Sequence, residues 1–146
     1  MNTVKHLESS SSPLLPKRQS SRNSYVPTVI FASLLGTYAE LFFVGKGYYE
    51  FSVRPFPYIF SINILFTLIV LPLFTWVFLY LANKMVSGWE RLVFMIFLSL
   101  LASIAERVAV RLGLLATSEQ WSHYYSFFGY FLFLVLVWIV SRSGKS

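Results

Sequence analysis

Four ionisable side chains interrupt long apolar stretches of this chain, and they are the residues best placed to do chemistry. Glu40 follows one uncharged stretch, and Glu106, Arg107 and Arg111 follow another. A charge in apolar surroundings is costly unless it is paired or hydrogen-bonded. Two interpretations follow: an ion pair that fixes the register of two helices, or a proton or ion relay.

The spacing of neighbouring residues favours a pair between Glu40 and Arg107. Small and polar side chains recur at intervals of three or four residues: Ser33, Gly36, Thr37 and Glu40 on one stretch, and Ser99, Ser103, Arg107 and Arg111 on the other. Side chains at this spacing share one face of a helix and allow close helix packing. We therefore expect these two helices to pack together, with Glu106 and Arg111 as alternative partners in the pair.

The loops carry the remaining candidates, Tyr48, Arg54, Trp121 and His123. Tyr and Trp concentrate at membrane interfaces because each has an apolar body and a polar group, which accounts for most of the loop aromatics. The segment 54–57, Arg-Pro-Phe-Pro, is stiffer than an ordinary loop because proline restricts the backbone. It predicts either a small external site or a cap over the helices.

Catalytic and metal chemistry find little support. His6 lies in a polar tail and His123 is isolated, so a two-histidine metal site is not expected. The chain has no Asp, which excludes a Ser-His-Asp triad. A glutamate could replace the aspartate, with Ser122 or Ser126 near His123, but adjacency in sequence does not give hydrogen-bond geometry. We expect no enzymatic activity, no metal and no cofactor.

Composition defines the surroundings of these residues. The chain of 146 residues is 56% hydrophobic and 19% aromatic, but only 12% charged, whereas about a quarter of the residues of soluble proteins are charged. Lipid, not water, is the solvent that suits this composition. Despite the net charge of +6, we expect no nucleic-acid binding. The basic residues lie mainly in the tails and between apolar runs, where positive charge sets membrane orientation.

The apolar runs predict an all-α, integral membrane four-helix bundle in residues 26–142, preceded by a disordered cytoplasmic tail in residues 1–25. The expected helices span about 27–45, 59–82, 91–115 and 124–141. The first and fourth are close to the roughly 20 residues needed to cross the hydrocarbon layer, and the second and third exceed that length. The third needs its charged residues to face protein or water, and Pro72 is expected to kink the second.

The distribution of Lys and Arg predicts that both termini are cytoplasmic. With the N-terminus inside, the inner side holds Lys5, Lys17, Arg18, Arg22, Lys84, Arg91, Arg142 and Lys145. The outer side holds Lys46 and Arg54, with Arg111 near the boundary. Positive charge is enriched in cytoplasmic loops, so this orientation in the cell membrane is favoured.

Several short segments carry a resemblance to a known family. They are Gly36 to Glu40, Gly45 to Gly47, Val53 to Pro57, Phe60 to Asn63, the region of Glu106, and Trp121 to Tyr130. From about Thr28 to Arg142 the chain resembles a family of small multi-pass membrane proteins of Gram-positive, spore-forming bacteria whose function is not established. The resemblance implies a bacterial membrane location and supplies no substrate, reaction or cofactor.

The sequence leaves three hypotheses for function. The leading one is a non-enzymatic membrane component that contacts the lipid bilayer, a second copy or another membrane protein. The second is a small oligomeric transporter or channel subunit that uses the buried Glu and Arg residues. The third and weakest is an intramembrane enzyme that uses Glu106 or His123.

Overall fold

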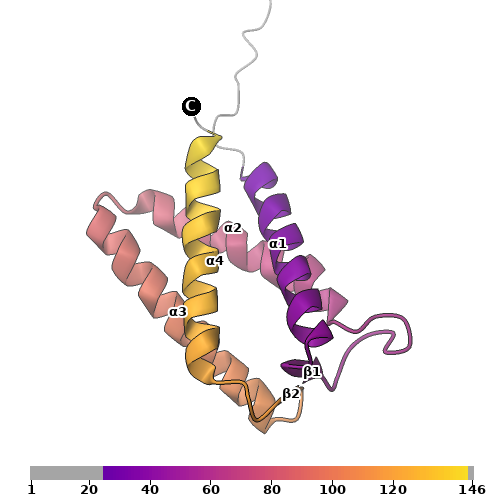
Figure 1. Ribbon diagram of the computed structural model, residues 1–146. Coiled ribbons are helices and arrows are strands. Elements are labelled where there is room, and N and C mark those ends of the chain that lie inside the picture. The colour runs from indigo at the N-terminus through magenta and orange to yellow at the C-terminus, as the bar shows by residue number, and fades with distance from the viewer. Residues whose placement is uncertain (1–24, 145–146) are drawn as a thin grey trace, which may run out of the picture.

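Four helices form the structure, a computed structural model that describes residues 25–144 (Figure 1). They are α1 (Val26–Gly45), α2 (Leu71–Lys84), α3 (Gly88–Arg111) and α4 (His123–Ser143), and a π-helical segment, η1 (Phe66–Val70), leads directly into α2. Each span is long and apolar enough to cross a membrane. The predicted all-α membrane four-helix bundle is confirmed, whereas the predicted disordered segment lies outside the described residues except for Tyr25.

Local hydrogen bonds explain where the helices begin. The side chain of Ser87 accepts a hydrogen bond from the backbone of α3 while Glu90 bonds back to Ser87, a capping box. Ser122 caps α4 in a similar way. The second span was expected from residue 59, but its helical turns begin only after Asn63, whose Oδ1 accepts from the Phe66 amide at 3.2 Å and so caps them. Residues 59–63 form a loop, Ile64 and Leu65 are helical, and η1 follows from Phe66.

The ends of α1 and α3 lead into two short strands that were not predicted. Gly47 and Gly113 adopt positive φ angles of 73° and 72°, which glycine tolerates and which turn the chain after each helix. β1 (Tyr49–Phe51) then pairs antiparallel with β2 (Leu115–Thr117), with Glu50 opposite Ala116. The expected third helix of 91–115 is therefore too long, because residues 113–115 belong to this turn and strand.

The helices do not pack in the predicted order. α4 packs against both α3 and α1, and α1 also packs against α2. In Figure 1 α4 stands between α3 and α1, so the expected direct packing of α1 on α3 along their polar stripes is wrong. The antiparallel pairing of β1 with β2 links the ends of these two helices instead.

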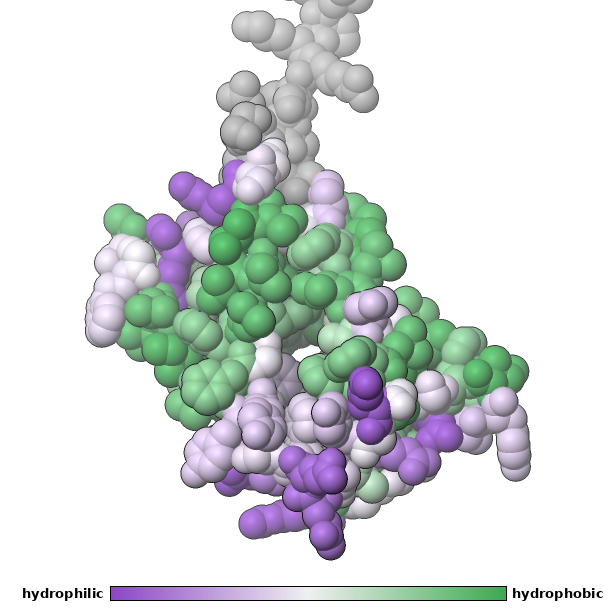
Figure 2. Space-filling view, viewed as in Figure 1, coloured by the Kyte–Doolittle hydropathy of each residue, from purple (hydrophilic) through white to green (hydrophobic). Residues whose placement is uncertain are grey.

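The apolar core and the buried carboxyl groups lie toward opposite ends of the bundle. The apolar core lies toward the ends of the described chain, here called the terminal end, and consists of Ala32, Phe78, Leu79, Ala82, Met95, Leu134 and Val137. The opposite end, where β1 and β2 pair antiparallel like the strands of a hairpin, is here called the hairpin end. It carries the buried Glu40 and Glu106 side chains. The surface has the same division, with a broad apolar band that gives way to hydrophilic residues at the hairpin end (Figure 2).

Candidate functional site

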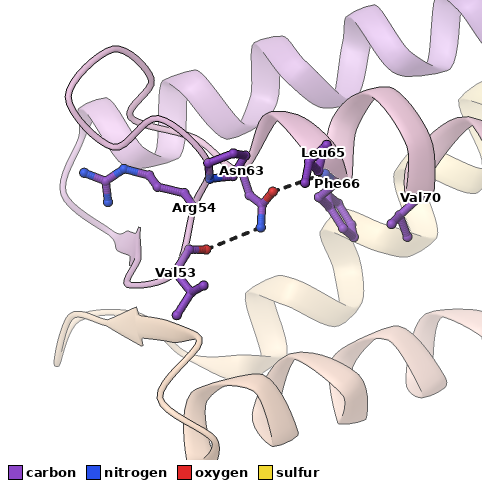
Figure 3. A pocket seen from close by; sticks show the side chains of 7 residues that line it. Val53, Arg54, Asn63, Leu65, Phe66 and Val70 are labelled. Atoms are coloured by element: carbon purple, nitrogen blue, oxygen red, sulfur yellow. Dashed lines mark hydrogen bonds between the residues drawn. The ribbon is translucent and has the colours of Figure 1, made fainter.

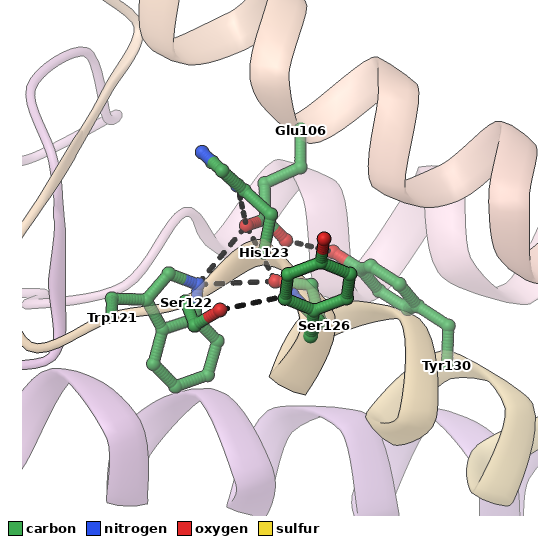
Figure 4. Close-up of polar contacts among 7 residues, drawn as sticks. Glu106, Trp121, Ser122, His123, Ser126 and Tyr130 are labelled. Carbon is green, nitrogen blue, oxygen red and sulfur yellow. Dashed lines mark hydrogen bonds and ion pairs between the residues drawn. The ribbon is translucent and has the colours of Figure 1, made fainter.

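Glu106 lies at the centre of a buried hydrogen-bond network at the hairpin end (Figure 4). Its Oε1 accepts from Ser126 Oγ at 2.6 Å and from the Trp121 indole nitrogen at 3.1 Å. Its Oε2 accepts from the Tyr130 hydroxyl at 3.0 Å. The Glu106 side chain is only 8% exposed. Both oxygens of this carboxyl group therefore accept hydrogen bonds from side chains.

Helix geometry places these donors. Ser126 and Tyr130 are four residues apart on α4, so both face α3. Trp121 lies in the loop before α4, and its indole nitrogen also donates to Ser126 Oγ at 3.0 Å. On α3, Glu106 follows buried Ser99 by seven residues, close to two full turns, and so lies on the same buried face.

His123 adds an ionisable group at the exposed side of the network. Its Nδ1 lies 3.5 Å from Glu106 Oε1, and about a third of its side chain is exposed. Protonation would turn this contact into an ion pair. The Ser126 hydroxyl donates to Glu106 and not to His123, so these side chains do not form a serine–histidine hydrogen bond of the kind used in nucleophilic catalysis.

An aromatic cluster covers the network. The Trp121 ring lies 5.4 Å from Phe43, 5.7 Å from Tyr48, 5.6 Å from Tyr49 and 6.1 Å from Tyr125, measured between ring centroids. Edge and tilted contacts at these separations are the favourable aromatic geometries. The cluster therefore brings the end of α1, strand β1 and the start of α4 together. Tyr48 and Trp121, both predicted as site residues, are members of it.

Glu40 approaches the same region from α1. It is 9% exposed, and its Oε2 has no hydrogen-bond partner within the described part of the chain. Burial raises the pKa of Tyr49, and the negative charges of Glu40 and Glu106 raise it further. Both carboxyl groups thus lie close enough to Tyr49 to affect its ionisation.

The predicted ion pair between Glu40 and Arg107 is wrong. Arg107 and Arg111 are exposed, and their guanidinium groups bond to no other residue in the region 25–144 that the structure describes. Successive positions four residues apart rotate by about 40° around a helix, because a turn takes 3.6 residues. The stripe from buried Ser99 therefore turns outward by Arg107, while Glu106 stays on the buried face.

Arg54 is held within its own loop. Its Nε donates to the Phe60 carbonyl at 2.9 Å and its Nη1 to the Phe51 carbonyl at 2.5 Å, and Nη1 lies 3.5 Å from Glu50 Oε1. An open pocket borders the loop, where Asn63 Nδ2 donates to the Val53 carbonyl at 3.4 Å (Figure 3). Because these polar groups bond within the chain, Arg54 and Asn63 favour the interpretation of a cap.

The arrangement suits proton chemistry better than metal binding or nucleophilic attack. No cluster of three His, Cys, Asp or Glu side chains suited to a metal occurs in residues 25–144. Two buried carboxyl groups with unlike surroundings remain, one with three donors and one whose Oε2 has none. Sequence reasoning missed Ser126 and Tyr130 as donors. The sequence does contain a signal for this site. Seven residues are close to two helical turns, so the step from Ser99 to Glu106 places both side chains on the same face of α3.

The fold and this cluster define a four-helix membrane protein with a buried carboxylate network beneath an aromatic cap. Comparison of the chain with protein-family models, with curated proteins and with solved structures finds no match.

Proposed function

We propose that the chain is a non-enzymatic, multi-pass component of the cell membrane that acts by contacting acidic lipid headgroups. The single observation that carries this proposal is the exposure of Arg107 and Arg111 on one side of α3. A positive charge on the outward surface of a membrane helix needs an anionic partner or access to water. Neither arginine finds that partner within the described residues.

The position of the two arginines suits a lipid phosphate. Arg111 is the last residue of α3, and Arg107 lies one turn, or about 6 Å, deeper. A long arginine side chain extends toward the headgroup layer from that depth, and its guanidinium binds phosphate through two parallel hydrogen bonds. Exposed Tyr124 and Tyr125 lie at the same end, as is typical of residues at a membrane interface.

Lipid-dependent stability tests the proposal. An acidic phospholipid added to the purified full chain in detergent should raise the unfolding temperature more than a zwitterionic lipid does. Arg107→Gln and Arg111→Gln should each lose about 1 kcal/mol of this stabilisation, since each basic residue near a membrane surface contributes about that much. Lys46→Gln is the matched control, because Lys46 is an exposed cation at the same end.

Two results would contradict the proposal. One is equal stabilisation by acidic and zwitterionic lipids. The other is an equal loss in Lys46→Gln and the arginine variants, which would indicate a general charge effect. A second membrane protein bound at α3 would appear instead as stabilisation by that partner, with the same dependence on Arg107 and Arg111.

A second candidate function is a small oligomeric transporter or channel subunit, which buried Glu40 supports because its Oε2 has no partner within residues 25–144. In that case the purified chain in liposomes moves an ion or solute, and Glu40→Gln reduces the flux. A stable monomer without flux would exclude this candidate. The family resemblance and the cytoplasmic placement of both termini stay predictions, supported by the sequence segments and by the Lys and Arg distribution.

A further inference from the structure

Glu40 and Glu106 are both buried but are solvated differently by the protein. Glu106 accepts hydrogen bonds from three side chains, whereas Glu40 is nine-tenths buried and its Oε2 accepts none from the described residues. An ionised carboxylate buried without donors costs several kcal/mol. The described residues thus supply hydrogen-bond donors to Glu106 but none to Glu40 Oε2, which a bound cation or proton would satisfy. Unlike surroundings of this kind separate the roles of paired carboxyl groups.

The two carboxyl groups are joined by a short chain of contacts. Phe43 lies one turn after Glu40 on α1 and packs against Trp121, whose indole nitrogen donates to Glu106. The Tyr49 ring lies 6.0 Å from Phe43 and 5.6 Å from Trp121. The negative charges of Glu40 and Glu106 both raise the pKa of Tyr49. The phenol of Tyr49 thus lies within electrostatic reach of both carboxyl groups.

The elements packed around Glu40 bring no basic side chain into contact with its carboxyl group in the described part of the chain. The ionisable groups that face this region are Tyr49 on β1, Glu106 on α3, and Tyr130 and His123 on α4. η1 carries no ionisable side chain, and those of α2, Tyr80 and Lys84, belong to its last turns at the terminal end. No basic side chain of the described region is paired with Glu40. Its negative charge therefore has no built-in counterion.

His123 extends the network toward the protein surface. It is about one-third exposed and contacts Glu106 at the hairpin end. Toward the terminal end the interior is filled by the apolar core, in which Phe78, Leu79 and Val137 are almost completely buried. The ionisable side chains near Glu40 therefore lie toward the hairpin end, which makes that end the proposed side of proton entry.

We propose that Glu40 is a reversible proton-binding site that is loaded from the hairpin end through His123 and Glu106, with Tyr49 and Tyr130 as the hydroxyl groups between them. An acid in the bulk solution gives up its proton and leaves its conjugate base there, and the proton forms an O–H bond at Glu40, whose carboxylate becomes neutral. The proposal goes beyond lipid contact, because it concerns the interior of the bundle and not the outward surface of α3.

Infrared spectroscopy of the full-length protein in liposomes tests this proposal. A protonated carboxylic acid has a C=O stretching band that is separate from the carboxylate bands and shifts in heavy water. We expect this band near neutral pH, and we expect it to be lost when the solution at the hairpin end is made alkaline. The band should be absent in Glu40→Gln. It should persist in Glu119→Gln, the matched control, because Glu119 is exposed.

The proposed route is tested separately from the site. Glu106→Gln and Tyr49→Phe should slow the loss of the band after an alkaline jump, while the band itself remains. The proposal is overturned if wild-type protein has no such band near neutral pH, or if the band survives in Glu40→Gln. It is also overturned if only the pH at the terminal end changes the band. The wild-type titration needs no substitution, so a variant that fails to fold does not remove the test.

Discussion

Glu106 shows how one residue holds three parts of the chain together. Its carboxylate joins α3 to the loop at Trp121 and to Ser126 and Tyr130 of α4. The net gain from each of these hydrogen bonds is modest, but a buried donor left without an acceptor costs about 1–3 kcal/mol. The network therefore contributes to stability mainly because breaking it leaves buried donors without acceptors, which is unfavourable.

Glu106→Ala should lower the free energy of unfolding by several kcal/mol, because the Tyr130 hydroxyl and at least part of the bonding of Trp121 lose their acceptor. Glu106→Gln keeps one acceptor oxygen and should cost less. Unfolding of the purified chain in detergent measures both changes. Glu119→Ala, at an exposed position, should leave stability nearly unchanged. Equal effects of Glu106→Ala and Glu119→Ala would show that the network contributes nothing.

The sequence predicted the candidate residues better than it predicted their partners. Glu106, Tyr48 and Trp121 lie together at the hairpin end, and Glu40 is close enough to Tyr49 there to affect its ionisation. Arg107 was the wrong partner for Glu40, because residues four apart do not stay on one helix face over the twelve residues from Ser99 to Arg111. The drift of about 40° at each step carries Arg111 about 120° away from Ser99.

At the scale of elements, Gly36 lies at a tight contact between α1 and α2. A Cβ atom on Gly36 would collide with Leu71 Cδ2, where α2 crosses α1. Leu71 is itself buried, so its side chain has little freedom to move away. Small residues allow membrane helices to approach in this way. Gly36, which was expected to face α3, thus serves the contact between α1 and α2.

Gly36→Ala should therefore destabilise the protein by about 1–3 kcal/mol, the usual cost of overpacking. Gly129→Ala is the matched control, because Gly129 is also within a helix and an added Cβ would contact nothing within 4 Å. Alanine favours helix formation equally at both sites, so the difference in unfolding free energy measures the collision. If the double variant Gly36→Ala with Leu71→Ala regains part of the lost unfolding free energy, the collision is with the Leu71 side chain. An equal gain in both single variants would contradict the prediction.

The helices themselves were predictable, but the segments between them were not. Uncharged runs of about 20 residues define spans whatever their neighbours are. The start of the second span depends on the side chain of Asn63, and the π-helical turn precedes Pro72, which has no amide hydrogen to donate. The pairing of β1 with β2 depends on tertiary structure, because these three-residue strands can pair only when the fold brings the ends of α1 and α3 near each other.

At the scale of the whole molecule, the four crossings require residues 25 and 144 to lie on the same side of the membrane. The hairpin and the loop before α4 must then lie on the other side, while the turn between α2 and α3 lies with the two ends. The distribution of basic residues predicts that the ends are cytoplasmic.

Single cysteines test this topology directly, because the natural chain has none. In intact cells a membrane-impermeant maleimide should label Glu119→Cys, and should label Val86→Cys and Gly144→Cys only after permeabilisation. All three positions are exposed, so burial does not protect them. Labelling of Gly144→Cys in intact cells would reverse the predicted orientation. Labelling of Glu119→Cys and Gly144→Cys from the same side would contradict four crossings.

The pairing of β1 with β2 has a consequence for the order of biosynthesis. The two strands are separated in the chain by α2 and α3, so β1 leaves the ribosome long before its partner exists. Glu106 waits for a shorter length of chain, because its donors Ser126 and Tyr130 follow it by 20 and 24 residues on α4. Until α4 has been made, the Glu106 carboxylate lacks both of these donors. The cluster can therefore be completed only when the last helix is in place.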